Sequence, residues 1–151
     1  MKMKNRKVLN ICLLVTWIVV IFIFSQQDGT ESSEKSQLAI NILTFLGLDV
    51  NGIFGDMADF IVRKGAHMTE YFILCFLAYR VFKDYAFRFA QWIALGFSFL
   101  YACSDEFHQT FIPGRLGCFK DVLIDTSGAL IFALIITLIN KSKERKQFIF
   151  R

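Results

Sequence analysis

The sequence predicts an all-α, polytopic membrane protein with four transmembrane helices, and three observations support this prediction. Hydrophobic residues make up 55% of the 151 residues, and the mean hydropathy is +0.48, above the usual range of soluble globular proteins. Proline occurs only once, which disfavours a turn-rich β-sandwich. Four apolar stretches follow one another along the chain. We therefore expect residues 1–151 to form a single membrane domain.

The first predicted span covers about residues 8–24, which contain no charged residue. This length is close to that needed to cross a hydrocarbon core of about 30 Å. A basic segment precedes the run, as in a signal peptide, but no small-x-small cleavage site follows Phe24. The pattern therefore favours an uncleaved first span.

The segment after this span, "GTESSEKSQLAINILTFLG", predicts a capped amphipathic helix. Polar residues suited to N-caps open it and Gly47 closes it, while Leu38, Ile42 and Phe45 recur at i, i+4 and i+7. We expect this helix to lie on the outer membrane surface. A second short helix is predicted over residues 54–62 and is expected to run into the second span, with room for a bend at Gly55 or Gly65.

The other three predicted spans cover about residues 66–82, 89–109 and 122–139. Aromatic and aliphatic residues are distributed around all sides of these predicted helices, which is not the one-sided pattern of soluble amphipathic helices. Only the ends of the segments are polar. Lysine and arginine are concentrated before the first span, between the second and third, and after the fourth. The positive-inside rule therefore predicts a multi-pass protein of the cell membrane with both termini in the cytoplasm.

This topology brings three polar clusters to the outer boundary of the membrane. Part of each cluster follows helical spacing and is expected to share a helix face: Arg63, His67 and Glu70; Asp105, His108 and Gln109; and Asp121, Asp125 and Gly128. The clusters are Arg63, Lys64, His67 and Glu70; Asp105, Glu106, His108 and Gln109; and Arg115, Asp121 and Asp125. We take these eleven residues as candidate ligand-binding residues.

Charged groups inside a membrane are costly, about 2.5 to 3.5 kcal/mol each on insertion scales, and usually face a bundle interior or a water-filled cavity. Three interpretations remain open. The clusters form an ion-paired plug that holds the helices together. Alternatively, they form a headgroup site in which Arg115, Arg63 and Lys64 clamp a phosphate or carboxylate.

The third interpretation is catalytic, with a divalent metal such as zinc or manganese activating a water molecule. The candidate metal ligands are His67, Glu70, His108 and Asp121, and the candidate catalytic residues are Glu70, Asp105 and His108. The spacing "HMTE" differs from the HExxH of metalloproteases. The sequence therefore leaves open whether the protein is an enzyme.

The remaining composition argues against other classes. The four cysteines form no CxxC pair, so neither a zinc knuckle nor a disulfide scaffold is expected. The basic segment "KSKERK" after the last span is expected to anchor the chain to anionic lipids. No nucleic-acid partner is expected, and the expected partners are membrane lipids and an amphiphilic or lipid-linked ligand at the outer leaflet.

Three motifs resemble the VanZ-like family: "FSQQ" at the end of the first span, "KGAHMTEYFIL", and "DEFHQTFIPGRLGCFKDVLIDTSGA". The last motif is long and specific, whereas the first two are weak alone. Together they extend from about residue 24 to residue 129. Some relatives carry Asn in place of Asp125, which weakens the case that a charge is required there.

The resemblance implies a small polytopic protein of the bacterial cell envelope. The family takes its name from a member linked to lowered susceptibility to the glycopeptide antibiotic teicoplanin, without enzymes that rebuild the peptidoglycan precursor. Teicoplanin carries an acyl chain and acts at the outer membrane surface. The expected function is therefore to engage an amphiphile, either an acylated glycopeptide or a lipid-linked wall precursor. The alternative is a metal-dependent hydrolase or transferase acting on such a lipid or wall intermediate.

Overall fold

The structure, a computed structural model, describes residues 2–115 and 117–149, and every regular element within these ranges is a helix. This confirms the predicted all-α class. The elements are α1 (Lys2–Ser25), α2 (Gly29–Phe45), α3 (Val50–Phe54), the 3-10 helix η1 (Gly55–Met57), α4 (Ala58–Asp84), α5 (Ala90–Gln109) and α6 (Phe119–Ile149).

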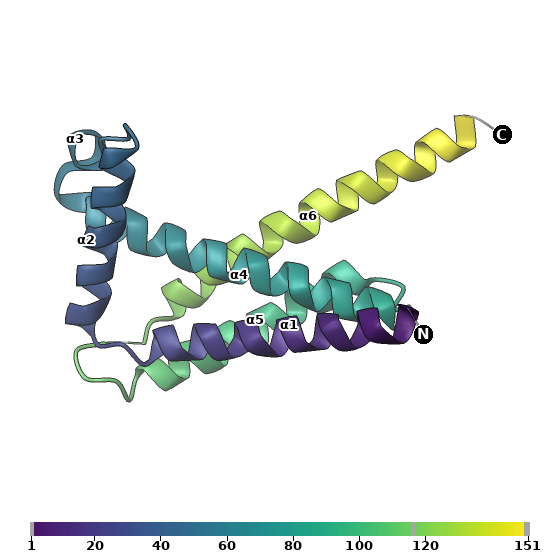
Figure 1. The fold of residues 1–151 in the computed structure, drawn as a ribbon, viewed down its shortest axis with the longest axis horizontal. Coiled ribbons are helices and arrows are strands. Elements are labelled where there is room, and N and C mark those ends of the chain that lie inside the picture. Colours follow the sequence, from purple (N-terminus) through teal and green to yellow (C-terminus); the bar gives the residue numbers. More distant parts are fainter. Residues whose placement is uncertain (1, 116, 150–151) are drawn as a thin grey trace.

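Helix α4 is the centre of the arrangement, because it packs against α1, α2, α5 and α6. Helices α1, α4 and α5 run side by side, α6 crosses them and extends away, and α2 lies across one end of the bundle (Figure 1). The N-terminus and the far end of α6 lie at the opposite end from α2 (Figure 1). The end of α1, the starts of α4 and α6, and the end of α5 therefore meet beside α2.

Small residues allow the central helices to approach closely. Ala78, Ala94 and Ala129 are fully buried in a core that also contains Cys75 and Phe132. At Gly128 of α6, an added Cβ would overlap the carbonyl oxygen of Met68 in α4. Such close backbone contacts are typical of helices packed in membranes, where van der Waals contact replaces the hydrophobic effect as the driving force.

Two helices are long and apolar enough to cross a membrane on their own, over Lys4–Ser25 and Phe119–Lys143. A third span results if Gly29–Phe45 and Val50–Asp84, which meet at 110°, count as one bent span. The four-span prediction is therefore not confirmed by length and composition. The physical reason is that α4 begins, and α5 ends, in charged residues that interrupt the apolar run.

Helix α2 matches the predicted helix over residues 29–47 closely, but its apolar residues occupy two faces. Ile40 is buried and packs with Ala58 of α4, whereas Leu38, Ile42 and Phe45 are exposed. A single amphipathic face is therefore not confirmed. The carboxylate of Asp28 caps the helix by accepting hydrogen bonds from the backbone N–H groups of Thr30 and Glu31, both at 2.9 Å.

The predicted short helix over residues 54–62 was wrong in its limits. Helix α3 begins earlier, at Val50, and a single turn of 3-10 helix joins it to α4. The bend lies at Gly55, whose φ of 53° favours glycine. Gly65, the other expected position for a bend, continues within α4.

Candidate functional site

The three predicted polar clusters lie at the same end of the bundle, beside α2. Lys64 Nζ of α4 lies 2.7 Å from Asp121 Oδ1 of α6, so the first and third clusters are joined by an ion pair. Glu106 of α5 accepts a hydrogen bond of 3.0 Å from the backbone N–H of Cys118, just before α6. These contacts hold the ends of α4, α5 and α6 around two adjoining cavities.

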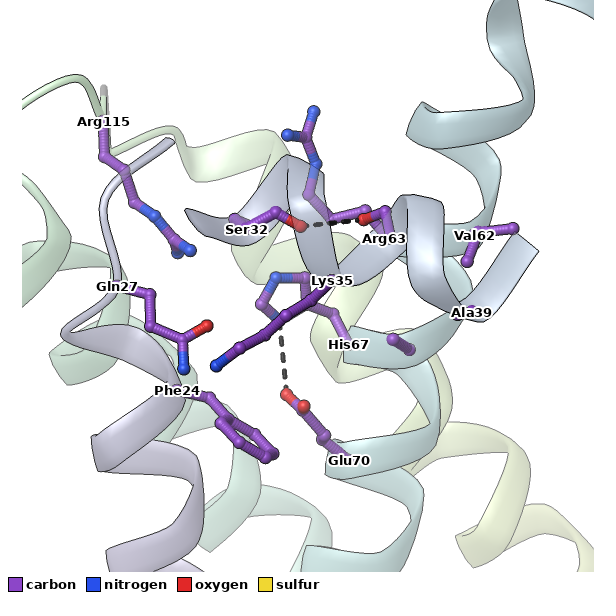
Figure 2. A pocket seen from close by; sticks show the side chains of 12 residues that line it. Phe24, Gln27, Ser32, Lys35, Ala39, Val62, Arg63, His67, Glu70 and Arg115 are labelled. Atoms are coloured by element: carbon purple, nitrogen blue, oxygen red, sulfur yellow. Dashed lines mark hydrogen bonds and ion pairs between the residues drawn. The ribbon is translucent and has the colours of Figure 1, made fainter. Parts of the chain in front are cut away.

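The first cavity, the apolar chamber, has a volume of about 210 Å³ and lies between α2 and α4. Its apolar lining comes from Phe24, Ala39, Val62 and Ala66, one or two residues from each of α1, α2 and α4. Polar side chains lie at its rim (Figure 2), among them Gln27, Ser32, Lys35, Arg63, His67, Glu70 and Arg115.

The second cavity, the polar chamber, has a volume of about 170 Å³. Its lining consists mainly of charged and hydrogen-bonding side chains: Ser32, Arg63, Lys64, His67, Glu106, Gln109, Arg115 and Asp121. Ser32, Arg63, His67 and Arg115 line both chambers. An apolar compartment and a charged compartment therefore adjoin along a shared boundary.

The polar chamber is closed on one side by a contact between two glycines. A Cβ at Gly29, the first residue of α2, would lie 3.1 Å from the carbonyl oxygen of Gly114. Gly114 has a φ of 76° in the turn that follows α5, a conformation that favours glycine. This contact places Arg115 close to the start of α2.

His67 and Glu70 are neighbouring polar residues of the apolar chamber. Nδ1 of His67 lies 3.4 Å from Oε2 of Glu70 (Figure 2), within electrostatic reach, but it has no partner in hydrogen-bond geometry. The backbone carbonyl of Glu70 accepts a hydrogen bond of 3.0 Å from the indole N–H of Trp17. This bond attaches α1 to the part of α4 that carries the site.

Two carboxylates predicted to be ligands are instead buried in the bundle and line neither chamber. Asp105, 5% exposed, accepts a hydrogen bond of 3.2 Å from the amide of Gln109. Asp125 is 2% exposed, and its Oδ2 has no hydrogen-bond partner among the described residues. The hydroxyl of Tyr71, a fully buried side chain, is likewise without a partner.

His108 contacts α1, whereas Asp105 and Gln109 are buried and pair with each other. Nε2 of His108 lies 2.8 Å from Nε2 of Gln26, and its ring lies 5.2 Å from that of Phe22. The imidazole therefore contacts the end of α1, and His108 lines neither chamber. At positions i, i+3 and i+4 of α5, Asp105, His108 and Gln109 are neighbours on the helix.

The candidate metal ligands His67, Glu70, His108 and Asp121 are likewise divided among separate contacts. Over residues 2–115 and 117–149, no group of three or more His, Cys, Asp or Glu side chains is placed to hold a metal ion. The metal-dependent alternative therefore gains no support from the arrangement. The candidate catalytic residues Glu70, Asp105 and His108 also have different partners.

Four residues that line the apolar chamber were not predicted from the sequence: Phe24, Gln27, Ser32 and Lys35. A signal was available for the α2 residues. Ser32, Ser36 and Ala39 recur at i, i+4 and i+7, so small residues follow one helix face and leave space beside Lys35. That face lines the apolar chamber.

The fold and this site define a small helical membrane protein with a two-compartment cavity at one end of its bundle. A protein-family comparison then identifies it more closely, because residues 10–140 match the family model described as VanZ/LLP1. The chain belongs to this family, which confirms the resemblance. Searches of curated proteins and of solved structures found no match.

Proposed function

We propose that the protein binds an amphiphile at the outer face of the cell membrane. The observation that carries this proposal is the pair of adjoining chambers, one apolar and one charged. An amphiphile has the same division between an acyl chain and a polar headgroup, so each part finds a matching compartment.

The proposed topology has four spans, both termini in the cytoplasm and the site at the outer leaflet. Helices α4 and α5 contain 27 and 20 residues, enough to cross about 30 Å at 1.5 Å per residue. Their charged residues lie at the end that carries the site, where a water-filled cavity lowers the cost of burial. The exposed Leu38, Ile42 and Phe45 of α2 would insert into the membrane interface.

Two natural amphiphiles fit this position: an acylated glycopeptide antibiotic and a lipid-linked cell-wall precursor. Binding of either one would lower susceptibility to teicoplanin, because the antibiotic or its target would be sequestered at the membrane surface. Family membership supports this proposal. Membrane lipids surround the bundle and are its other partners.

The test compares teicoplanin with its deacylated form, using protein reconstituted in nanodiscs. We expect the acylated compound to bind at least about tenfold more tightly, since burying two CH2 groups already contributes about 1.6 kcal/mol. Ala66→Phe fills the apolar chamber and should abolish this preference. Thr69→Phe on the same helix is the matched control, because Thr69 is exposed and lines neither chamber.

The same variants can be tested in a susceptible bacterium that expresses the chain. Expression of the wild-type protein or Thr69→Phe should raise the inhibitory concentration of teicoplanin, whereas Ala66→Phe should not. Equal binding of the acylated and deacylated compounds by a folded wild-type protein would contradict the proposal for the antibiotic. The same comparison with a lipid-linked precursor and its water-soluble headgroup tests the second candidate.

A further inference from the structure

We infer that the amphiphile carries a phosphate-class anionic headgroup, held between Lys35 of α2 and Arg115 of the turn after α5, with one acyl chain in the apolar chamber. This inference rests on the proposed function and narrows its two candidate ligands to the lipid-linked precursor, because an acylated glycopeptide carries no phosphate group. It also replaces the clamp expected from the sequence, which consisted of Arg115, Arg63 and Lys64.

Two cations of the site, Lys35 and Arg115, are available to bind an external anion. Lys64 is engaged by Asp121 at 2.7 Å, and Arg63 lies 3.9 Å from Asp59. Within residues 2–115 and 117–149, neither Lys35 nor Arg115 has a carboxylate within 4.0 Å. These two cations can therefore accept an external anion without breaking an ion pair.

Lys35 and Arg115 come from opposite walls and both point toward the middle of the apolar chamber (Figure 2). The Lys35 ammonium lies 5.3 Å from the centre of the Phe24 ring, a cation–π contact that positions it over the apolar lining. Asp28 interacts electrostatically with Arg115 without an ion pair, and its carboxylate accepts the N–H groups of Thr30 and Glu31.

The acids of the site already have partners of their own. Glu70 faces His67, and Glu106 accepts the N–H of Cys118. The rim of the apolar chamber therefore presents three cations, Lys35, Arg63 and Arg115, against a single acid. This imbalance favours an anionic ligand over a cationic or zwitterionic one.

A phosphate group fits this pair of cations better than a carboxylate. Phosphate monoesters carry a charge of about −1.5 to −2 and offer three acceptor oxygens, whereas a carboxylate carries one charge on two oxygens. One charge would leave either Lys35 or Arg115 unpaired. Gln27 and Ser32, which also line the chamber, supply neutral donors for a third oxygen.

The size of the apolar chamber limits how many acyl chains of the ligand it can hold. Its volume of about 210 Å³ is below the roughly 300 Å³ at which pockets for drug-sized ligands begin. Its lining is narrow, with two alanines, one valine and one phenylalanine. A single acyl chain suits this space, whereas the second chain of a diacyl lipid would remain in the bilayer.

Native mass spectrometry of the full-length protein in a neutral detergent tests the inference with three probes: dodecyl phosphate, the uncharged dodecyl glucoside, and inorganic phosphate. We expect dodecyl phosphate to bind at least about tenfold more tightly than either of the others, since a hydrogen bond to a charged group contributes about 1.5 to 3 kcal/mol. Lys35→Gln and Arg115→Gln should each weaken it by a similar factor. Lys120→Gln, an exposed residue that lines neither chamber, is the matched control.

The outcomes distinguish a failure of this inference alone from a failure of the proposed function as well. Equal binding of dodecyl phosphate and dodecyl glucoside would overturn the anionic headgroup and leave amphiphile binding standing. Binding of inorganic phosphate as tight as that of dodecyl phosphate would identify a free anion as ligand and overturn both. Absence of binding by all three probes to a folded wild-type protein would also overturn both, with circular dichroism as the folding check.

Discussion

Lys64 and Asp121 join α4 to α6 through a contact of 2.7 Å between Nζ and Oδ1. Their side chains are 16% and 27% exposed, so the pair lies between a surface ion pair and a buried one. We expect Lys64→Met to lower the free energy of unfolding by about 1 to 2 kcal/mol, because Asp121 loses its partner in a partly desolvated position. The double variant Lys64→Asp, Asp121→Lys should recover most of this loss, as measured by thermal unfolding in detergent. Failure of the swap to recover stability would show that the pair contributes little.

Gly128→Ala should destabilise the bundle by about 1 to 3 kcal/mol, the usual cost of overpacking a core. The reason is the overlap between the added methyl group and the carbonyl oxygen of Met68. Gly96→Ala in α5 is the control, because a Cβ there meets nothing within 4 Å. This control should stabilise the helix by about 0.5 to 1 kcal/mol. Equal effects of the two variants on the melting temperature would argue against close packing of α4 and α6.

Asp125→Asn should leave the bundle as stable as the wild-type protein or make it more stable. Asp125 Oδ2 is buried without a partner, and a neutral amide of the same size costs less to bury than a carboxylate. Asp105→Asn is the comparison, because Asp105 accepts a hydrogen bond from Gln109 and its replacement should destabilise. A loss of stability in Asp125→Asn larger than in Asp105→Asn would reveal an interaction that depends on the charge.

Asp28 should stabilise α2 in a pH-dependent manner. Hydrogen bonds from the Thr30 hydroxyl and the Glu31 N–H lower the pKa of the Asp28 carboxyl below its usual value of 3.8. Because the pKa of Asp28 is lower in the folded state, the stabilisation by its carboxylate is complete well above pH 3.8. This stabilisation is lost as the pH falls through the pKa of Asp28 in the folded protein. Asp28→Ala should therefore increase hydrogen exchange in α2 at pH 7, and the difference from the wild-type protein should shrink below pH 3.8. Asp49→Ala, which removes the cap of α3, should leave exchange in the first turn of α2 unchanged.

The proposed topology predicts which native cysteine reacts from outside the cell. Cys118 is exposed and lies just before α6, beside the site. A chain that retains only Cys118 should react with a membrane-impermeant thiol reagent on intact cells. A cysteine-free chain carrying Lys141→Cys should react only after the cells are opened, since residue 141 lies near the far end of α6. The reverse pattern would place the site on the cytoplasmic side.

Helix limits were largely predictable from local signals. The third predicted span was limited at Gln109, before Pro113 and Gly114, and α5 ends at this residue, because proline and glycine interrupt helices. The position of the bend between α3 and α4 was harder to predict from the sequence, since both Gly55 and Gly65 were compatible with it. The choice of Gly55 depends on the packing of Val50 with Ala58, a tertiary contact that periodicity does not contain.

The site was predictable where its residues lie on one helix and less so where two segments meet. Arg63, His67 and Glu70 follow the spacing of α4, and all three line the apolar chamber. Lys35 belongs to the site only because α2 folds back across the end of the bundle. The contact of His108 with Gln26 at the end of α1 is also a tertiary contact, which helical spacing within α5 does not contain.

The contact between Gly29 and Gly114 has a mechanical consequence. Lys35 lies about two turns along α2 from the first of these glycines, and Arg115 directly follows the second. The two walls of the cavity thus share one pivot with no side chains in it. A ligand held by both cations would therefore connect α2 to the turn after α5 across a contact formed by backbone atoms alone.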